Sequence, residues 1–417
     1  RCGPGTKPYN EALALIASRN PEIKISTGSC SYVVWISFSG LGNRILSIAS
    51  TFLYALLTNR VLLVDRGSSM EDLFCEPFPF SSWLLPRDFP LMNRFSSFNQ
   101  SSASSFGHLI KTNAFKRDSL HPFLYLHLTH DYSNDDKLFF CDEQQSLLHR
   151  IPWLIIKTDN YFAPSLFLSE SFGEKLAPLF PDKTTVFHHL GRYLFHPTDV
   201  VWGLVTRYYN SYMAKADERI GIQIRVFDER QGPLDHVTEQ LLACIDKENI
   251  LPQVLPSSSS FPEKNAKTKS VLLTSLSKGY AEILATIYWE SPTTTGEVVG
   301  VHQPSTEGFQ QTERGQHNRK AWAEMYLLSM TDALVTSAWS TFGYVAQGLG
   351  GMRPWILYKA ENDTYPDPPC GRAASMEPCF HAPPFYDCKL KRGADSGELI
   401  PHVRHCEDMS WGLKIFG

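Results

Sequence analysis

Hydrophobic and polar residues follow two kinds of pattern along most of the chain. Residues 32–38 are almost continuously apolar, which is typical of a strand buried on both faces. From Ile45 to Leu57 the apolar residues recur every three or four positions, which predicts an amphipathic helix. A second apolar run at 61–65 predicts the next strand. Strand, glycine loop, helix and strand in this order predict a βαβ unit whose loop lies at the carboxyl edge of a parallel sheet.

The same alternation continues after residue 120. Apolar runs predict strands at 124–128, 153–157, 271–275, 333–337 and 354–358, and period-2 alternation predicts another strand at 220–227. Periodic stretches predict helices at 200–213, up to 287, at 319–330 and at 342–349. Residues 66–120 are rich in Ser, Phe and Pro and give no ordered pattern. Residues 251–270 contain a run of serines and indicate an exposed, mobile loop.

The length of the chain favours two folded units, because 417 residues exceed what one compact core accommodates. We expect an α/β fold in which two Rossmann-like domains face a cleft. The N-terminal domain is expected at 1–195 and the C-terminal domain at 196–370. A Cys-rich tail at 371–417 is expected to pack back on both.

The charge balance excludes several classes of partner. Lys and Arg total 39 and Asp and Glu total 43, so the net charge is −4, which argues against binding to nucleic acid or to an anionic membrane surface. No apolar run is long enough to cross a bilayer. Because the chain begins with Arg1 instead of Met, we expect it to be a fragment whose signal peptide or membrane anchor lies upstream.

The cysteines indicate an oxidising compartment. There are nine, with no C-x-x-C pair, and four of them crowd the tail, at Cys370, Cys379, Cys388 and Cys406. This favours disulfides over a zinc site, and the odd number leaves at least one thiol free or paired outside the chain. The acceptor sequons at Asn99 and Asn362 predict N-glycosylation, which agrees with the same compartment.

The first candidate site is the loop Gly40-Leu41-Gly42-Asn43-Arg44. Glycines let backbone N–H groups approach a phosphate, a helix N-terminus adds a favourable dipole, and Arg44 adds a full charge. The alternative is a tight strand-to-helix turn with Arg44 in solvent.

The second candidate is Arg225, at the end of an apolar predicted strand. A planar guanidinium suits a diphosphate better than an ammonium does, and we expect it to emerge into the cleft. The alternative is a structural ion pair with Asp228 or Glu229.

The third candidate is the loop Trp339-Ser340-Thr341-Phe342-Gly343, between a predicted strand and a helix. Ser340 or Thr341 is expected to cap the helix. The same hydroxyls and amides could also hold a phosphate, and the two roles are compatible.

The motifs argue against a metal site. The chain has no Asp-x-Asp, no P-loop and no H-E-x-x-H. The clustered ionisable residues are better explained as ordinary hydrogen-bonded side chains, namely His127, His130, Asp131, His188 and His189. Two carboxylates are candidate acids or bases, Asp159 at the end of a predicted strand and Asp408 in the tail, although each could be an ordinary surface residue.

The chain resembles the plant cell-wall fucosyltransferases, the family that includes the xyloglucan α-1,2-fucosyltransferases. The resemblance extends from Arg1 to Gly412, and its most specific stretches are Val34-to-Asn43, Phe187-to-Tyr193, Gly221-to-Asp228 and Met325-to-Gly351. It implies a variant GT-B fold and a type II membrane protein of the Golgi lumen. It also implies an inverting enzyme that uses GDP-fucose as donor without a metal or other cofactor.

The resemblance also assigns site residues. Arg225 is implied to bind the GDP diphosphate, and the Gly42-Asn43-Arg44 turn is similar to the Gly-x-Gly-Asn turn of protein O-fucosyltransferases. Further donor-binding residues are expected at Gln223, Thr274, Ser275, Ser340, Thr341 and Phe342. Gln223 stands where several fucosyltransferases carry a His. Asp159 and Asp408 match positions associated with acceptor activation, with Asn43 and Arg225 as the other catalytic candidates.

The expected reaction is transfer of fucose to O-2 of a terminal galactose on xyloglucan. Alternatives are fucosylation of arabinose or galactose on arabinogalactan proteins, and a non-catalytic Golgi glycan-binding protein. A homodimer or a Golgi synthase complex is an expected assembly. The aromatic stretch 66–120, with Trp83, either forms a sugar-stacking platform or belongs to the core.

Overall fold

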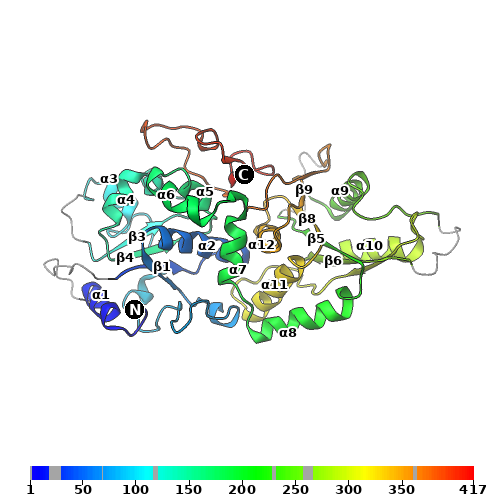
Figure 1. Ribbon diagram of the computed structural model, residues 1–417, viewed down its shortest axis with the longest axis horizontal. Coiled ribbons are helices and arrows are strands. Elements are labelled where there is room, and N and C mark those ends of the chain that lie inside the picture. Colours follow the sequence, from blue (N-terminus) through cyan, green and yellow to red (C-terminus); the bar gives the residue numbers. More distant parts are fainter. Residues whose placement is uncertain are drawn as a thin grey trace.

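The computed structural model describes residues 2–17, 30–67, 69–115, 121–227, 232–256, 266–359 and 364–417. Two main β-sheets lie side by side, each with helices packed on it (Figure 1). This is the α/β architecture expected from the alternating patterns. Among the described residues, no helix combines the length and the apolar character needed to cross a membrane.

The first sheet has four parallel strands in the order β2-β1-β4-β3. Because its central strands are covered on both faces, their sequences are nearly continuous apolar runs, as the patterns predicted. The strands are β1 (Ser31–Ile36), β2 (Arg60–Val64), β3 (Phe123–His127) and β4 (Trp153–Lys157).

The second sheet has six strands in the order β10-β9-β8-β5-β6-β7, all parallel except β10. Sequence patterns did not predict β7, an edge strand whose residues are all at least partly exposed, so it lacks a continuous apolar run. The strands are β5 (Glu218–Ile224), β6 (Thr268–Ser275), β7 (Val298–His302), β8 (Ala333–Ser337), β9 (Trp355–Leu357) and β10 (Cys370–Arg372).

The predicted helices are present. The last one, α12, ends at Gly350, and Gly351 follows with a φ of 68°, a left-handed conformation that glycine adopts without strain. The helices are α1 (Lys7–Ala17), α2 (Leu41–Leu57), α3 (Phe106–Lys111), α4 (Asp142–Leu148), α5 (Ala163–Leu166), α6 (Glu170–Leu179), α7 (Val186–Leu194), α8 (Asp199–Tyr208), α9 (Leu234–Lys247), α10 (Gly279–Glu290), α11 (Gly315–Leu328) and α12 (Thr341–Gly350).

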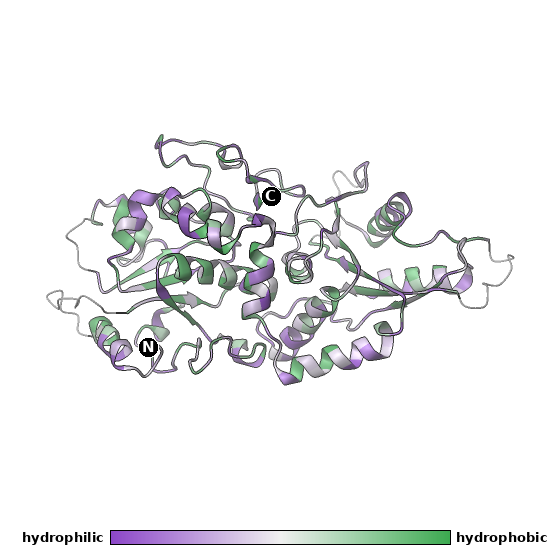
Figure 2. Cartoon of the chain, in the orientation of Figure 1, coloured by the Kyte–Doolittle hydropathy of each residue, from purple (hydrophilic) through white to green (hydrophobic). Residues whose placement is uncertain are grey.

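Four helices, α2, α7, α11 and α12, lie between the two sheets (Figure 1). They share one buried cluster, to which α2 contributes Ile45 and the helices near the second sheet contribute Trp322 and Tyr344. The apolar face predicted for α2 is buried except at Leu56, and the helix is mainly green in Figure 2. A common core therefore fixes the position of one sheet relative to the other.

Trp83 belongs to the core. Its side chain is 2% exposed, and its ring packs edge-on against Phe74. Of the two alternatives for the aromatic stretch 66–120, the structure therefore favours core packing at this residue over a sugar-stacking platform.

Disulfides attach the C-terminal tail to the rest of the molecule. One disulfide joins the tail to the start of α4, and another joins β10 to α9. Each closes a long loop of the chain and so lowers the conformational entropy of the unfolded state. Cys75 is free and exposed, as the odd number of cysteines required. The four bonds are Cys2–Cys30, Cys141–Cys388, Cys244–Cys370 and Cys379–Cys406.

A buried carboxyl group, Glu377, also anchors the tail. Its two oxygens accept hydrogen bonds from the Tyr161 hydroxyl at 2.7 Å and from the Phe187 backbone N–H at 2.8 Å. Burial raises the pKa of Glu377 to about 8, because the charged form loses its hydration. Glu377 thus fixes the tail to the first turn of α7, and the folded state favours its protonated form.

We predict that Glu377 makes stability fall as the pH rises. Between its ordinary pKa of 4.5 and a folded pKa of about 8, the folded chain holds a proton that the unfolded chain has released. The free energy of unfolding therefore decreases with pH by at most about 1.4 kcal/mol per unit over this interval. Urea denaturation across this pH range should show that the free energy of unfolding changes less steeply with pH in Glu377→Gln than in the wild type. Equal slopes would contradict the assignment.

Candidate active site

A cavity of about 370 Å³ opens between the carboxyl edges of the two sheets. The loops after β1, β5, β6 and β8 line it, which is where ligands bind in open α/β sheets. The cavity brings together the predicted residues Gly42, Asn43, Gln223, Arg225, Thr274, Ser275, Ser340, Thr341 and Phe342. Three other predicted residues, Arg44, Asp159 and Asp408, do not line it.

Asn43 links three elements at the wall of the cavity. Its Nδ2 donates to the Asp159 carbonyl at 3.1 Å, and its Oδ1 accepts from the Thr341 hydroxyl at 2.9 Å. The first turn of α2 is therefore tied to the end of β4 and to the first turn of α12. No side chain caps α2 at Gly40, so its first backbone N–H groups donate to no capping side chain.

Gly42 permits the close approach of α2 to α12. A Cβ atom at this position would lie 2.7 Å from Thr341 Oγ1, 2.9 Å from the Thr341 carbonyl carbon and 3.0 Å from the Phe342 nitrogen. Two of these atoms belong to the backbone and cannot move independently of the helix. The glycine is therefore needed for packing between the two helix N-termini, in addition to any contact with a ligand.

The loops before α2 and α12 contain the same backbone feature. Ser39 has a φ of 67° and Trp339 a φ of 63°, left-handed conformations that cost non-glycine residues about 1–3 kcal/mol. Arg44 holds the first loop, because its Nε donates to the Ser39 carbonyl at 2.8 Å. Asp408 holds the second, because its Oδ2 accepts from the Trp339 backbone N–H at 2.9 Å and its carbonyl accepts from the indole N–H.

Arg44 is located behind its loop. The residue is 2% exposed, and its Nη2 lies 2.8 Å from Glu313 Oε1, in the segment that precedes α11. The guanidinium thus supports the glycine loop and joins it to the second half of the chain. The alternative of a solvent-exposed side chain is therefore wrong, and the phosphate contact of Arg44 stays a prediction.

Arg225 lies directly after β5 and faces the cavity. Its backbone N–H donates to the Ser337 hydroxyl at 3.0 Å, and its Nη2 donates to Gln310 Oε1 at 3.1 Å. Burial lowers the pKa of the guanidinium, but arginine keeps its charge at neutral pH. The alternative partners Asp228 and Glu229 lie outside the described residues.

Two other predicted residues have structural partners. Ser340 Oγ accepts a hydrogen bond from the Gly343 backbone N–H at 3.3 Å, which confirms the expected helix cap. Gln223 is buried, and its Oε1 accepts from the Thr336 hydroxyl at 2.8 Å. This bond fixes the amide, so its NH₂ group is the part left for a ligand.

Sequence patterns missed an ionisable part of the cavity wall on and before α11. Burial raises the pKa of Glu324 to about 7, and its carboxyl group accepts a hydrogen bond from Ser305. Nearby, Lys320 pairs with Glu307. The helix was predicted only from its apolar periodicity, which does not reveal a carboxylate on the buried face.

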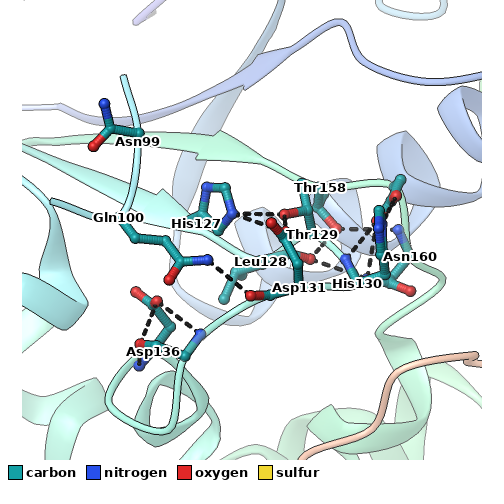
Figure 3. A network of polar contacts seen from close by, with 12 residues as sticks. Asn99, Gln100, His127, Leu128, Thr129, His130, Asp131, Asp136, Thr158 and Asn160 are labelled. Carbon is teal, nitrogen blue, oxygen red and sulfur yellow. Dashed lines mark hydrogen bonds and ion pairs between the residues drawn. The ribbon is translucent and has the colours of Figure 1, made fainter. Parts of the chain in front are cut away.

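The histidines at the end of β3 form hydrogen bonds, as expected (Figure 3). His127 Nε2 lies 2.7 Å from the Thr129 hydroxyl and 3.1 Å from Asp131 Oδ1. His130 Nδ1 lies 2.7 Å from Asp159 Oδ2, and this contact raises the pKa of His130. The Asp159 carboxylate is therefore already paired where the two strands end.

The tail contains the described side chains that come closest to a metal-ligand set. Cys379, Cys406 and Asp408 have ligand atoms within 4.8 Å of one another, but the two sulfurs are bonded to each other.

Asn99 is exposed, as a glycosylation site requires, whereas Asn362 lies outside the described residues. Occupancy of either sequon stays a prediction.

Known proteins resemble this chain over its whole length. A family model described as xyloglucan fucosyltransferase matches residues 1–389. The galactoside 2-alpha-L-fucosyltransferase of Arabidopsis thaliana is 62% identical over 416 residues, which cover 100% of this chain and 74% of that protein. Its counterpart in Pisum sativum is 63% identical over 420 residues, covering 100% and 73%. The solved structure of an arginine-to-lysine mutant of Arabidopsis thaliana FUT1 in complex with GDP has a TM-score of 0.92 and 61% identity, covering 100% of this chain and 89% of that one.

We predict that Gly42→Ala destabilises the protein by about 1–3 kcal/mol, the usual cost of overpacking a tight contact. Thermal or urea denaturation measures the change. Gly173→Ala is the matched control, because a Cβ there has nothing within 4 Å, and alanine is the better helix former. Equal stability of Gly42→Ala and wild type would show that the two helices can separate without cost.

Proposed function

Because the chain belongs to the xyloglucan fucosyltransferase family, we propose that it transfers L-fucose from GDP-fucose to O-2 of a terminal galactose on xyloglucan, with inversion at C1. Its fold is the variant GT-B arrangement, with the cavity between two α/β halves. The observation that carries the proposal is that Arg225 and the N-terminal turn of α2 line the same cavity. The GDP complex of the related FUT1 supports a guanine nucleotide as part of the donor.

Departure of GDP is the step that requires positive charge. As the C1–O bond breaks, the sugar becomes oxocarbenium-like and charge accumulates on the diphosphate. We assign its stabilisation to Arg225, Asn43 and the N-terminal turns of α2 and α12. Thr274, Ser275, Ser340 and Phe342 are assigned to donor binding beside them. Hydrogen bonds to Gln310 and Thr341 already hold the Arg225 and Asn43 side chains, so these two residues need little reorganisation during the reaction.

Acceptor activation is assigned to the surroundings of Asp159 and Asp408. Neither carboxylate lines the cavity, but each of the two residues contacts one that does. The Asp159 backbone carbonyl accepts from Asn43, and the Asp408 carboxylate accepts from the Trp339 backbone N–H. An oxocarbenium-like sugar accepts a weak nucleophile, so the proton can leave the acceptor late in the reaction.

The proposal includes no metal ion, because the arginine and the helix N-termini supply the positive potential.

We also place the protein in the Golgi lumen, as the soluble part of a type II membrane protein. The four disulfides support an oxidising compartment of this kind.

We predict turnover on galactose-terminated xyloglucan, measured as GDP release in EDTA and confirmed by linkage analysis of the product. Defucosylated arabinogalactan protein is assayed beside it and should give little release. Release with arabinogalactan alone would favour the alternative acceptor, and a requirement for Mg²⁺ would overturn the metal-free mechanism. Absence of both GDP binding and GDP release would favour the non-catalytic glycan-binding protein.

We predict that Arg225→Ala lowers the transfer rate by about 10²–10³-fold or more, because the leaving diphosphate loses its main cationic partner. Arg225→Lys should recover little, since an ammonium lacks the planar pair of donors. Arg207→Lys, at an exposed position on α8, is the control and should keep the wild-type rate. Near-normal transfer by Arg225→Ala with normal folding would remove this residue from the mechanism.

A further inference from the structure

His381 lines the same cavity, although it comes from the C-terminal tail. It follows the disulfide-bonded Cys379 by two residues, so the disulfide holds this part of the tail in place. Trp411 Nε1 donates to the His381 carbonyl at 3.1 Å, which adds a second constraint on the backbone. No sequence motif singled out this histidine.

A chain of hydrogen bonds determines which nitrogen of the His381 imidazole carries the proton. The Tyr344 hydroxyl donates to Asp408 Oδ2 at 2.5 Å, so its single proton is in use. His381 Nε2 lies 3.2 Å from the same hydroxyl oxygen, which can therefore only accept from it. The neutral ring thus carries its proton on Nε2, and Nδ1 keeps a free lone pair.

The described part of the chain provides no hydrogen-bond partner for Nδ1 of this residue. The arrangement resembles a base oriented by a half-buried carboxylate, with a tyrosine inserted between them. Asp408 supports both the Trp339 loop and this ring, since its Oδ2 accepts from both Trp339 and Tyr344. The Asp408 carboxylate thereby links the conformation of the Trp339 loop to the orientation of the imidazole.

We propose that His381 is a catalytic base that accepts the proton of the acceptor hydroxyl, with Tyr344 and Asp408 as positioning residues. The inference rests on the proposed fucosyl transfer and names the group that completes it. The acceptor oxygen forms a bond to C1 as the C1–O bond to GDP breaks, and that electron pair leaves with the β-phosphate. The hydroxyl proton moves to Nδ1, and the resulting imidazolium keeps its Nε2 proton on the Tyr344 oxygen.

The electrostatic surroundings suit this role. Burial lowers the pKa of His381, so the ring is neutral before the reaction. Asp408 and Asp159 act in the opposite direction and stabilise the imidazolium once it forms. Among the described residues, the ring contacts Tyr344 and is influenced by the charges of Asp408 and Asp159, and neither carboxylate lines the cavity. The histidine is therefore better placed than either carboxylate to contact an acceptor.

The main test is His381→Gln, which retains an N–H for the Tyr344 oxygen but has no basic nitrogen. We expect transfer to fall by about 10²–10³-fold, while GDP affinity measured by calorimetry is unchanged. His149→Gln, at an exposed position after α4, is the matched control. A near-normal rate for His381→Gln, or loss of GDP binding with the loss of transfer, would overturn the assignment.

The pH profile distinguishes a base from a merely structural residue. In the wild type, kcat/KM should decrease on the acidic side as the ring becomes protonated, and His381→Gln should lose this decrease. Tyr344→Phe should shift it to lower pH, because the imidazolium loses an acceptor for its Nε2 proton. An acidic limb that neither variant changes would contradict the proposal.

The wild-type assay separates this inference from the proposed function. If wild type transfers no fucose, the proposed function fails. If wild type transfers fucose and both variants do so with unchanged rates and profiles, only the role of His381 fails. Tyr344→Phe, which removes one oxygen atom, provides the test if the glutamine variant does not fold.

Discussion

The contact between the first turns of α2 and α12 determines the geometry of the active-site cavity. Gly42 lets the two helices approach, and the hydrogen bond between Asn43 and Thr341 joins them. Because each helix follows a strand at the carboxyl edge of its own sheet, this contact brings the two edges together. The positive ends of two helix dipoles then line one cavity, where Arg225 adds a full charge. Loss of this contact would separate the groups that we propose act together on the leaving diphosphate.

Charged side chains behind the loops maintain this geometry. Arg44 and Asp408 each hold a loop that contains a left-handed residue, Ser39 or Trp339. A hydrogen bond to a charged group contributes about 1.5–3 kcal/mol, enough to offset the strain of such a residue. A charged residue near an active site can therefore matter for the shape of the loop instead of for contact with the ligand. Asp408 combines this structural role with the hydrogen bond to Tyr344 from which we infer the orientation of His381.

Most of the fold could be predicted from local patterns. Central strands such as β1 and β4 are buried on both faces, so their sequences are apolar runs that are easily recognised. The edge strand β7 and the short tail strands β11 (Val403–His405) and β12 (Leu413–Ile415) were missed, because partial exposure and short length leave no comparable pattern. The tail depends on disulfides and on single buried contacts such as that of Glu377, and neither kind of contact has a sequence period.

The sequence by itself determined the two α/β halves, the three loops at strand ends and the presence of a disulfide-bonded tail. It also supplied many of the residues that line the cavity, because these directly follow strands and the chain order places them at one edge. Only the tertiary structure decided which charges face the cavity. Arg44 and Asp159 are paired outside it, whereas His381 and Glu324 contribute to its wall. The physical reason is that side-chain direction and partners depend on packing between segments far apart in the chain, and local spacing carries no information about that packing.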